Sequence, residues 1–214
     1  AARKSSAEIT IAGYSLTGTK AFISGGGYSD AYIVMARTDP DSAHGISAFL
    51  VDDGLAGLSF GGLEDKMGWK SQPTRQVQMD SCKVASDCLL GEEGNGFKYA
   101  MAGLDGGRLN IAACSIGAAQ SALDQTLSYM SERKAFGKSI DQFQGLQFRL
   151  ADIEIELQAA RTFLRQAAWK LDNGAHDASV FCAMAKKQCT EVGSRVADQC
   201  LLLHVGYGYL ADYG

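Results

Sequence analysis

The sequence predicts an α+β protein of two domains: a small antiparallel β-barrel or sandwich over residues 1–88, then an antiparallel up-and-down helical bundle over residues 89–214. Two observations predict this class. Up to about residue 90 the apolar residues stand in short β-branched or aromatic runs divided by glycine or Asp-Pro, the pattern of strands joined by turns. After that point they recur every three, four or five positions over long stretches, which is the helical period.

The predicted strands follow one another at close spacing. The first stretch, "EITIAGYSLTGTKAFIS" (8–24), alternates around a bend at Gly13. Four further strands are predicted in "AYIVMART" (31–38), "GISAFLVD" (45–52), "LSFGGLE" (58–64) and "TRQVQMDSCKV" (74–84). A turn or loop, "TDPDSAHG" (38–45), joins the first two of these four. Short strands separated by turn residues predict an antiparallel barrel or sandwich.

Three long helical patterns follow "GEEGNG" (91–96). Their apolar residues run from Phe97 to Met130, from Phe148 to Leu171, and from Val180 to Leu203. Gly174 stands where a glycine commonly ends a helix, just beyond the second pattern. Helices of this length exceed the usual globular length and predict an antiparallel bundle.

The bulk composition excludes several classes of function. Apolar content of 46% and a net charge of −4 are ordinary for a globular protein. The 20 lysines and arginines are scattered, which argues against a nucleic-acid partner, because such partners need a clustered basic patch. No apolar stretch approaches about 18 residues, so we expect no membrane span.

The six cysteines show neither a C-x-x-C pair nor the Cys/His spacing of a metal site. We therefore expect no metal site and no disulfide framework, and we interpret Cys182 and Cys189, seven apart on a helical pattern, as small core residues. A reducing compartment follows as the default.

A glycine-rich segment follows a predicted strand in "KAFISGGGYSD" (20–30). Phe22, Ile23 and Ser24 offer an aromatic ring, an apolar side chain and a hydroxyl at the strand end, a combination that suits a planar, polar-edged ring such as a flavin. The alternative is a glycine-rich hairpin loop. The segment is not G-x-G-x-x-G, and no helix follows it to support a Rossmann phosphate loop.

Two adjacent glycines interrupt the first long helix in "LDGGRLN" (104–110). Each costs about 1 kcal/mol relative to alanine, so the pair calls for a reason. Gly106 and Gly107 leave room for a ligand or another helix, and Asp105 and Arg108 offer an acceptor and a fork of donors one turn apart. The alternative is a helix crossing with an i, i+3 ion pair.

"RKAFGKSIDQFQGLQF" (133–148) follows the first long helix. Arg133 suits a phosphate because its guanidinium binds in a bidentate way, and Gln144 adds an amide nearby. The alternative is a cation placed in the last turn of a helix, where it is favoured anyway. His204, with apolar neighbours, is interpreted as a packed histidine.

Taken together, these segments resemble the acyl-CoA dehydrogenase family in order and spacing over essentially the whole chain. The family's "TG-x-K-x-(W/F)-I-(S/T)-x-G" is similar to "TGTKAFISGG" (17–26), its "GEEGxGF" to "GEEGNGF" (91–97), and its "LDxxR" to "LDGGR" (104–108). Its "R-K-x-F-G" with a later glutamine is similar to "RKAFG" (133–137) with Gln144, and its "HGGxGY" turn to "HVGYGY" (204–209). Any one motif is weakly specific, whereas five in order are strongly specific.

A further stretch, "KMGWKSQPTRQV" (66–77), resembles the "GWxSQPTR" form of the isobutyryl-CoA branch of the family. The resemblance implies a middle β domain, a C-terminal helical bundle, a homotetramer and non-covalent FAD. It implies α,β-dehydrogenation of a short branched acyl-CoA, isobutyryl-CoA being favoured, as in valine catabolism. Electrons would pass to electron-transferring flavoprotein. The location would be the cytoplasm of a bacterium or the mitochondrial matrix of a eukaryote.

The resemblance also implies which residues hold the ligands. Phe22, Ile23 and Ser24 would line the flavin ring. The dinucleotide part of FAD, from a neighbouring subunit, would be contacted by Arg133, Phe136, Phe143, Gln144, Leu202, Leu203, His204, Val205 and Gly206. The pantetheine and nucleotide part of the substrate would be contacted by Asp105, Gly106, Gly107 and Arg108.

The chain departs from the family pattern in the turn after the third helix and at the base. Leu202 replaces a glutamine and Val205 a glycine in the turn. The family's catalytic glutamate follows this turn in an "EG(T/S)NE" segment, or in some relatives precedes the arginine of "LDxxR", where this chain has Gly107. We therefore assign no catalytic residue and expect the general-base glutamate beyond Gly214. On this basis the sequence is expected to be an internal fragment, inactive by itself.

Three alternative functions remain at this level. One is another short-chain or 2-methyl-branched dehydrogenase, acting on butyryl-CoA or 2-methylbutyryl-CoA. Another is a flavoenzyme of the acyl-CoA oxidase type. The third is a non-catalytic relative of the fold that serves as an assembly module.

Overall fold

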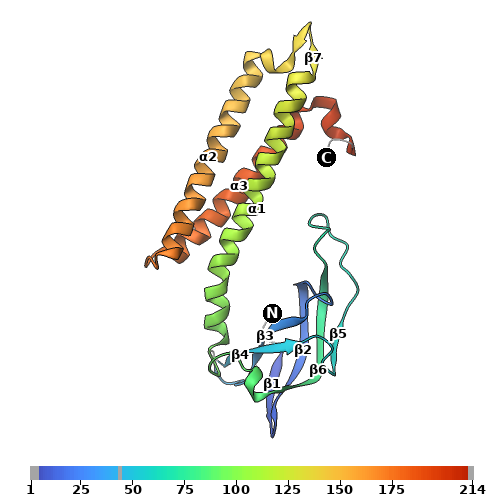
Figure 1. Ribbon diagram of the computed structural model, residues 1–214, viewed down its shortest axis with the longest axis vertical. Helices are drawn as coiled ribbons and strands as arrows, with labels where there is room; N and C mark the ends of the chain where they lie inside the picture. Colours follow the sequence, from blue (N-terminus) through green and yellow to red (C-terminus); the bar gives the residue numbers. More distant parts are fainter. Residues whose placement is uncertain (1–4, 43–44, 212–214) are drawn as a thin grey trace. The chain divides into compact units, whose positions relative to one another are not determined.

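The structure is a computed structural model that describes residues 5–42 and 45–211, and the chain divides into two compact units, Ala1–Ala102 and Gly103–Gly214. The division falls inside the first long helix, α1 (Gly96–Glu132). The first unit is built on strands and the second on helices (Figure 1). The predicted class, a β domain followed by a helical domain, is therefore confirmed.

One six-stranded sheet forms the first unit. Its strands are β1 (Ser6–Thr10), β2 (Gly13–Ser24), β3 (Ala31–Arg37), β4 (Ile46–Asp52), β5 (Leu58–Phe60) and β6 (Thr74–Ala85). They lie in the order β4-β3-β1-β2-β6-β5. Every pairing is antiparallel except β1 with β3, which is parallel through Ser6 and Arg37. A short 3₁₀ helix, η2 (Ser86–Cys88), follows β6.

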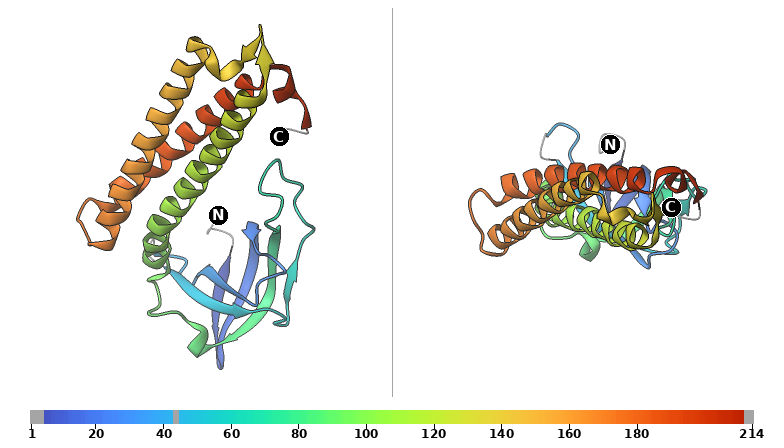
Figure 2. Two further views of the ribbon diagram at one scale, coloured as in Figure 1. Left: turned by 45° about the horizontal axis from the view of Figure 1, so that its top comes forward. Right: turned by 90° about the horizontal axis from the view of Figure 1, so that it is seen from above.

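The sheet curves around a single apolar core (Figure 2). Its centre holds Leu16, Phe49 and Val51, which are fully buried, and the Tyr14 ring meets the Phe49 ring edge-on at 4.8 Å. Val77 and Met79, and again Cys82 and Val84, are buried with the two-residue period of a strand. The three-residue step from Met79 to Cys82 coincides with a register shift of β6 against β2. Residues 43 and 44 of the predicted 38–45 loop lie outside the described residues.

Three helices form the second unit and run alongside one another (Figure 2). They are the rest of α1, then α2 (Gln144–Asp172) and α3 (Ala178–Leu203). The connection from α1 to α2 contains a hairpin, β7 (Lys134–Ala135) and β8 (Lys138–Ser139), and a 3₁₀ helix, η3 (Ile140–Gln142). A further 3₁₀ helix, η4 (Val205–Tyr209), follows α3.

All three helices contribute to one core. Ile116 and Leu123 come from α1, Leu157 from α2, and Val192 and Val196 from α3, all of them buried. Gly193 marks the close approach of α3 to α1, because a Cβ added there would lie 3.0 Å from the Ser115 carbonyl oxygen. The bundle interior is thus set by aliphatic residues, small residues and buried cysteines.

The second helix ends where the sequence predicts. Asn173 is the C-cap of α2, and Gly174 follows in the left-handed conformation with φ 62°. The Gly174 amide donates to the Leu171 carbonyl, and the Ala175 amide donates to the Lys170 carbonyl. These two bonds are the Schellman arrangement, which explains why glycine is needed at this position.

Among the described residues, no helix has the length and apolar content that a membrane crossing requires. In the same part of the chain, no group of three or more His, Cys, Asp or Glu side chains is arranged to hold a metal ion. All six cysteines are free thiols: Cys82, Cys182, Cys189 and Cys200 are buried, Cys88 is half-buried and Cys114 is exposed.

Candidate functional site

Three of the predicted ligand-contacting residues share an unusual backbone conformation. Phe22, Phe136 and Val205 have φ values of 58°, 51° and 54°. Non-glycine residues avoid this region, and each such residue costs about 1–3 kcal/mol, most of all for a β-branched side chain. Their side chains are nonetheless 76%, 97% and 76% exposed. At each of these three residues a strained backbone holds an apolar side chain in solvent.

Phe22 sits in a bulge near the end of β2. Lys20 pairs with Val77 and Ile23 pairs with Arg75, so two residues of β2 lie opposite one residue of β6. A bulge of this kind turns the strand and redirects a side chain. Phe22 consequently points out of the sheet.

Ile23 and Ser24 line a cavity of about 560 Å³ in the β unit. Most of the other lining residues come from β3. Lys20, on β2, and Val77, on the adjacent strand β6, complete the lining. Lys20 Nζ donates to the Met35 carbonyl oxygen at 2.6 Å, and burial lowers the pKa of Lys20. A mostly apolar hollow with a hydroxyl and an amine at its edge fits a planar ligand with polar edges.

The β7–β8 hairpin carries Phe136 at its tip. Phe136 and Gly137 are the two turn residues and both have positive φ, which defines a type I′ turn. Such turns favour asparagine or aspartate at the first position, where this chain has phenylalanine. The Phe136 and Phe143 rings lie 6.3 Å apart at 83°, and Lys138 Nζ lies 4.2 Å from the centre of the Phe143 ring. Gln144, the first residue of α2, is exposed.

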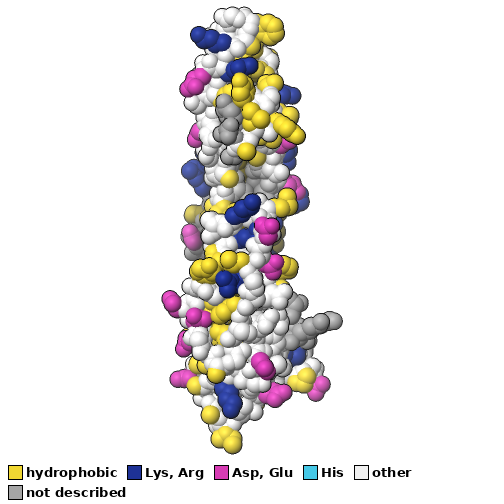
Figure 3. All heavy atoms as spheres, turned by 90° about the vertical axis from the view of Figure 1, so that its right-hand side faces the viewer, with side chains coloured by type: hydrophobic (Ala, Val, Ile, Leu, Met, Phe, Trp, Pro, Cys, Tyr) yellow, Lys and Arg dark blue, Asp and Glu magenta, His cyan; other side chains and the backbone are white. Residues whose placement is uncertain are grey.

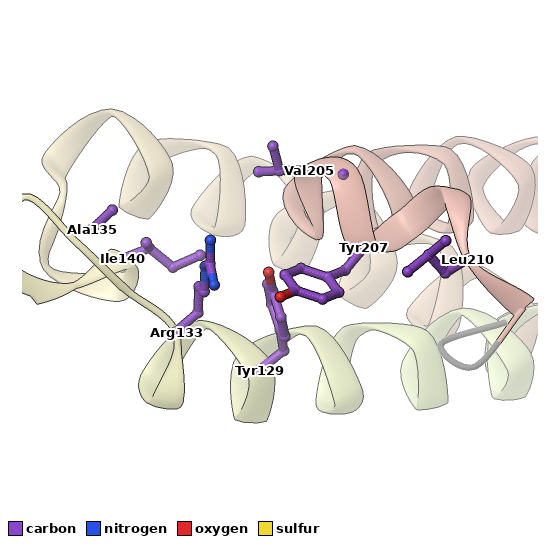
Figure 4. A pocket seen from close by; sticks show the side chains of 8 residues that line it. Tyr129, Arg133, Ala135, Ile140, Val205, Tyr207 and Leu210 are labelled. Carbon is purple, nitrogen blue, oxygen red and sulfur yellow. The ribbon is translucent and has the colours of Figure 1, made fainter.

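A cavity of about 540 Å³ lies in the helical unit where α1 ends and η4 begins. Tyr129 of α1 and Arg133, the residue directly after α1, project toward Tyr207 of η4 (Figure 4). Val205 and Gly206 also line the cavity. The guanidinium carbon of Arg133 lies 5.2 Å from the centre of the Tyr207 ring, which is cation–π distance.

Arg133 takes part in none of the ion pairs among the described residues. Its guanidinium is therefore a cation at the rim of a cavity, next to the open backbone of Gly206, where an added Cβ would meet nothing within 4 Å. Hydrophobic side chains gather over the same end of the helical unit (Figure 3). Phe136, Val205, Tyr209 and Leu210 are among the exposed hydrophobic residues of this end. This arrangement fits an anionic group attached to an apolar or aromatic body.

His204 packs inside the unit, in agreement with its interpretation as a packed histidine. Its ring stacks on Tyr129 with centres 4.4 Å apart, and its Nδ1 lies 2.9 Å from the Cys200 carbonyl oxygen. The Tyr129 hydroxyl donates to the His204 carbonyl oxygen at 3.3 Å. Leu203 is buried as well, whereas Leu202 is exposed. His204 and Leu203 thus pack against the core at the start of η4, and neither lines the cavity at Arg133.

The Asp105–Arg108 pair forms the i, i+3 contact that the sequence suggests. Arg108 Nη1 lies 2.6 Å from Asp105 Oδ1, and the Ser179 hydroxyl donates to the same carboxylate oxygen at 3.0 Å. Gly106 and Gly107 lie between them, and a Cβ added to either would meet nothing within 4 Å. The structure therefore contains both features that the sequence suggested, the Asp105–Arg108 ion pair and open space at the two glycines.

Five residues that line the helical cavity were not predicted as site residues from the sequence, and two of them are aromatic, Tyr129 and Tyr207; the other three are Ala135, Ile140 and Leu210. Tyr129 lies one helical turn before Arg133, and Tyr207 lies in the same turn as Val205. The only signal in the sequence that could have identified these tyrosines was their nearness to Arg133 and Val205, which were predicted to contact the ligand. The structure brings Arg133, Val205 and Gly206 into one cavity, while Phe136, Phe143 and Gln144 lie outside its lining.

Comparison with known proteins adds independent information. The model of the acyl-CoA dehydrogenase middle domain matches residues 1–82, and that of the acyl-CoA dehydrogenase C-terminal domain matches residues 94–214. The chain is 47% identical over 200 residues to mitochondrial isobutyryl-CoA dehydrogenase of Bos taurus, covering 94% of this chain and 48% of that protein. The chain thus spans about half the length of such relatives.

Solved structures agree with this assignment. Butyryl-CoA dehydrogenase from Megasphaera elsdenii superposes with a TM-score of 0.95 at 40% identity, covering 99% of this chain and 55% of that one. A structure described as PigA with FAD and proline superposes with a TM-score of 0.89 at 29% identity, covering 99% and 55%. Both domain models and the relatives point the same way: the chain belongs to the acyl-CoA dehydrogenase family.

Proposed function

We propose that this protein is an FAD-dependent acyl-CoA dehydrogenase that acts on a short branched acyl-CoA, with isobutyryl-CoA as the favoured substrate. Members of this family are FAD flavoproteins, and FAD supplies the hydride acceptor. The observation that carries the proposal is the cavity at Arg133, where a cation without an ion-pair partner among the described residues lies beside apolar side chains and open glycine backbone.

Arg133 is proposed to donate to phosphate oxygens of the dinucleotide. Its planar fork matches a phosphate in a bidentate way, and the Tyr207 ring beneath it orients the guanidinium. Phe136, held outward by the type I′ turn, supplies apolar area to the same ligand. Gln144, Phe143 and the Leu202–Gly206 turn complete this proposed surface, with FAD of a neighbouring subunit as its ligand.

Phe22, Ile23 and Ser24 are proposed to line the flavin ring. The bulge in β2 sends Phe22 outward and leaves Ile23 and the Ser24 hydroxyl on the cavity wall. A ring can stack on apolar side chains there and exchange hydrogen bonds with the hydroxyl at its polar edge.

Asp105, Gly106, Gly107 and Arg108 are proposed to bind the pantetheine and nucleotide part of the substrate. The open space over the glycines admits an extended chain against the helix backbone, and Arg108 carries donors toward it. The Asp105 carboxylate and the Ser179 hydroxyl fix the Arg108 side chain, so its donors are held in one direction before the ligand arrives.

We assign no general base within residues 1–214. Gly107 occupies the position immediately before Arg108, and a glycine cannot accept a proton. These 214 residues by themselves are accordingly proposed to bind ligand without turnover. Turnover of isobutyryl-CoA by a polypeptide of these residues alone, with an artificial electron acceptor, would contradict this.

The favoured substrate rests on the similarity to isobutyryl-CoA dehydrogenase and on the "KMGWKSQPTRQV" segment. Electron-transferring flavoprotein is the proposed electron acceptor and a homotetramer the proposed assembly. The proposed place is the cytoplasm if the source is bacterial or the mitochondrial matrix if it is eukaryotic.

The test is anaerobic flavin bleaching by the whole protein with bound FAD. We expect isobutyryl-CoA to bleach the flavin absorbance faster than butyryl-CoA or 2-methylbutyryl-CoA. If another thioester bleaches the flavin fastest, that thioester is the preferred substrate. Fast peroxide formation on adding oxygen would indicate an oxidase. Loss of flavin during gel filtration, or no bleaching by any of the three thioesters, would favour a non-catalytic assembly module.

A further inference from the structure

One amine of the β unit is held at a cavity wall without a counter-ion. Lys20, on β2, lines the cavity of about 560 Å³ whose wall also holds Ile23 and Ser24. Its Nζ donates to the Met35 carbonyl oxygen at 2.6 Å. Among the described residues, Lys20 takes part in no ion pair, and this neutral carbonyl is its only hydrogen-bond acceptor. The side chain is half-buried, so water stands in for the counter-ion only in part.

Lys170 of the helical unit, which is likewise half-buried, shows how such a charge is usually accommodated. Its side chain is 19% exposed, and its Nζ lies 2.8 Å from each carboxylate oxygen of Asp177. A partly buried charge that is paired in this way keeps its charged form, whereas an unpaired one is disfavoured by the loss of water. Lys20 belongs to the second kind.

The rest of the cavity wall carries no charge either. Apart from Lys20, it consists of aliphatic side chains, Met35, two serines and Tyr32. Tyr32 is the one further titratable residue of the wall, and its hydroxyl accepts from the Gly27 amide at 2.9 Å and donates to the Gly25 carbonyl at 3.3 Å. Burial without a compensating charge lowers the pKa of Lys20.

A lysine in this state is a nucleophile. A lowered pKa leaves more of the side chain as the neutral amine near neutral pH, and only the neutral amine attacks an electrophile. The bond to Met35 uses one N–H, so the lone pair of the tetrahedral nitrogen points away from that carbonyl. Ile33, on the same wall, is 66% exposed, which shows that the cavity is open to solvent. A molecule from solution can therefore enter beside the amine.

The cavity wall suits an acyl thioester as the electrophile. Its aliphatic side chains provide contact for a short acyl chain. The hydroxyls of Ser24 and Ser29 are donors for the carbonyl oxygen, on which negative charge develops during the attack. Acyl-CoA is the thioester that the proposed function brings to this protein. The choice of electrophile thus rests on the proposed function, whereas the reactive amine rests on the cavity.

We propose that Lys20 is an acylation site. Its Nζ attacks the thioester carbonyl carbon of an acyl-CoA, a carbon–nitrogen bond forms, and the carbon–sulfur bond breaks. Coenzyme A leaves as its thiol with the proton that the amine gives up, and no oxidant or reductant takes part. The amide product is uncharged and fills part of the cavity, so acylation competes with the flavin ring that is proposed to occupy the same space.

The first experiment incubates the whole protein, freed of FAD, with acetyl-CoA near neutral pH. Acetyl-CoA has no β-carbon and cannot undergo α,β-dehydrogenation, so the result does not depend on the dehydrogenase activity. Neutral hydroxylamine removes acetyl groups from thiols such as Cys114, and peptide mass spectrometry then measures the amides. We expect Lys20 to be acetylated at least about threefold faster than Nα-acetyllysine in the same solution, because more of its amine is neutral.

The ratio of these two rates should depend on pH. It should fall as the pH rises to the ordinary lysine value of 10.5, where Nα-acetyllysine becomes neutral as well. A ratio at or below one near neutral pH, or a ratio that does not fall with rising pH, would overturn the proposal.

A matched pair of variants tests the cause of the reactivity. Ile33 precedes Met35 by two residues on β3 and therefore lies on the same face of the strand. Ile33→Asp supplies the missing carboxylate and should slow Lys20 acetylation near neutral pH by about tenfold, because it favours the charged ammonium. Ile9→Asp is the control: Ile9, on β1, is 71% exposed and outside the cavity wall, so the rate should not change. Equal rates in the parent and both variants would contradict the proposal.

Bound FAD separates this proposal from the placement of the flavin ring. FAD should protect Lys20 from acetylation and leave Lys83, an exposed lysine of β6, unprotected. Acetylation of Lys20 at the same rate with and without FAD would support the acylation site and exclude the flavin ring from this cavity. Absence of acetylation at Lys20 in both forms would overturn the acylation site and leave the dehydrogenase proposal untouched.

Discussion

At the scale of single residues, Phe22, Phe136 and Val205 hold apolar side chains outward on a backbone that L-residues avoid. The backbone conformation favours glycine at position 205 and asparagine at position 136 over the residues present. An exposed apolar side chain adds little to the folded state in compensation, and for Phe136 this is an edge contact with the Phe143 ring. Such strain persists where a side chain is needed for contact with a ligand or partner. Val205 is the clearest case because its side chain is β-branched.

Replacing Val205 by glycine tests whether this strain is useful. The left-handed conformation costs about 1–2 kcal/mol for valine, and glycine returns about 0.5–1 kcal/mol of chain entropy to the unfolded state. We therefore expect Val205→Gly to raise the free energy of unfolding by about 0–1.5 kcal/mol. If the side chain hinders the proposed FAD contact, FAD affinity should rise as well. Urea unfolding and FAD titration of the apoprotein measure the two effects.

Val180 provides the matched control for that substitution. It is an exposed valine in α3, where glycine carries only its helix cost, so Val180→Gly should lower the free energy of unfolding by up to about 1 kcal/mol. A loss of stability in Val205→Gly equal to that in Val180→Gly would contradict the strain argument.

At the scale of elements, the β7–β8 hairpin presents Phe136 on a turn that favours asparagine. Phe136→Asn should therefore leave the free energy of unfolding unchanged or raise it by roughly 0.5–1 kcal/mol. FAD affinity should fall by about tenfold or more, because a buried aromatic contact is lost. Stability and binding thus move in opposite directions. Phe136→Tyr, which keeps the ring, should retain FAD affinity. An equal loss of FAD affinity in both variants would show that the ring does not contact FAD.

The glycines of α1 allow a second prediction for an element. Gly106→Ala should raise the free energy of unfolding by about 1 kcal/mol, because the added methyl meets nothing within 4 Å and alanine favours a helix. If the open space holds substrate, the KM for the acyl-CoA should rise by at least about tenfold.

Gly117→Ala is the control for Gly106→Ala. Gly117 lies in the same helix and is equally open, so its substitution should bring the same stability without a change in KM. A KM that moves equally in both variants, or in neither, would remove the glycine pair from the substrate site.

The sequence predicts these elements well where the signal is local. The three helices and the glycine end of α2 are confirmed, because period and cap are local properties. The β7–β8 hairpin was not predicted, since strands of two residues have no period and "RKAFG" also fits a helix stop. The parallel pairing of β1 with β3 depends on a contact between residues far apart in the chain, which no local pattern contains.

Apolar residues at helical spacing do not all face the core. Phe97, Phe148 and Val180 fit the helical period, and their helices form, but their side chains are exposed. A period says which residues share a face, but it does not say whether the face meets core, ligand or partner. The candidate site was predicted where a motif was present, as at Arg133, and missed at Tyr129, whose role follows only from η4 lying opposite α1.

At the scale of the whole molecule, buried acidic groups set the alkaline limit of stability. Burial raises the pKa of the Cys82, Cys182, Cys189 and Cys200 thiols and of the Tyr14 hydroxyl. A group whose pKa is raised by folding stabilises the folded state fully below its unfolded pKa, and this contribution is lost as pH rises through the folded pKa. The free energy of unfolding should therefore fall with rising pH above the ordinary thiol value of 9.0.

Urea unfolding, followed by helical circular dichroism at a series of pH values, measures this fall. Cys189→Ala should reduce its slope, because one buried thiol no longer ionises on unfolding. The matched control is Cys114→Ala, which removes an exposed thiol and should leave the slope as it is. A stability that stays level or rises above pH 9 would contradict the argument.

The burial of the α3 thiols has a kinetic consequence. Cys182, Cys189 and Cys200 all face the inside of the helical unit, while Cys114 stands in solvent on α1. A thiol-reactive dye should mark Cys114 at once and reach the other three only when α3 lifts away from its neighbours. Dye uptake measured at the peptides that contain Cys182, Cys189 and Cys200, and so kept apart from that of Cys82 and Cys88 in the β unit, therefore gives the rate at which α3 opens, with no engineered label.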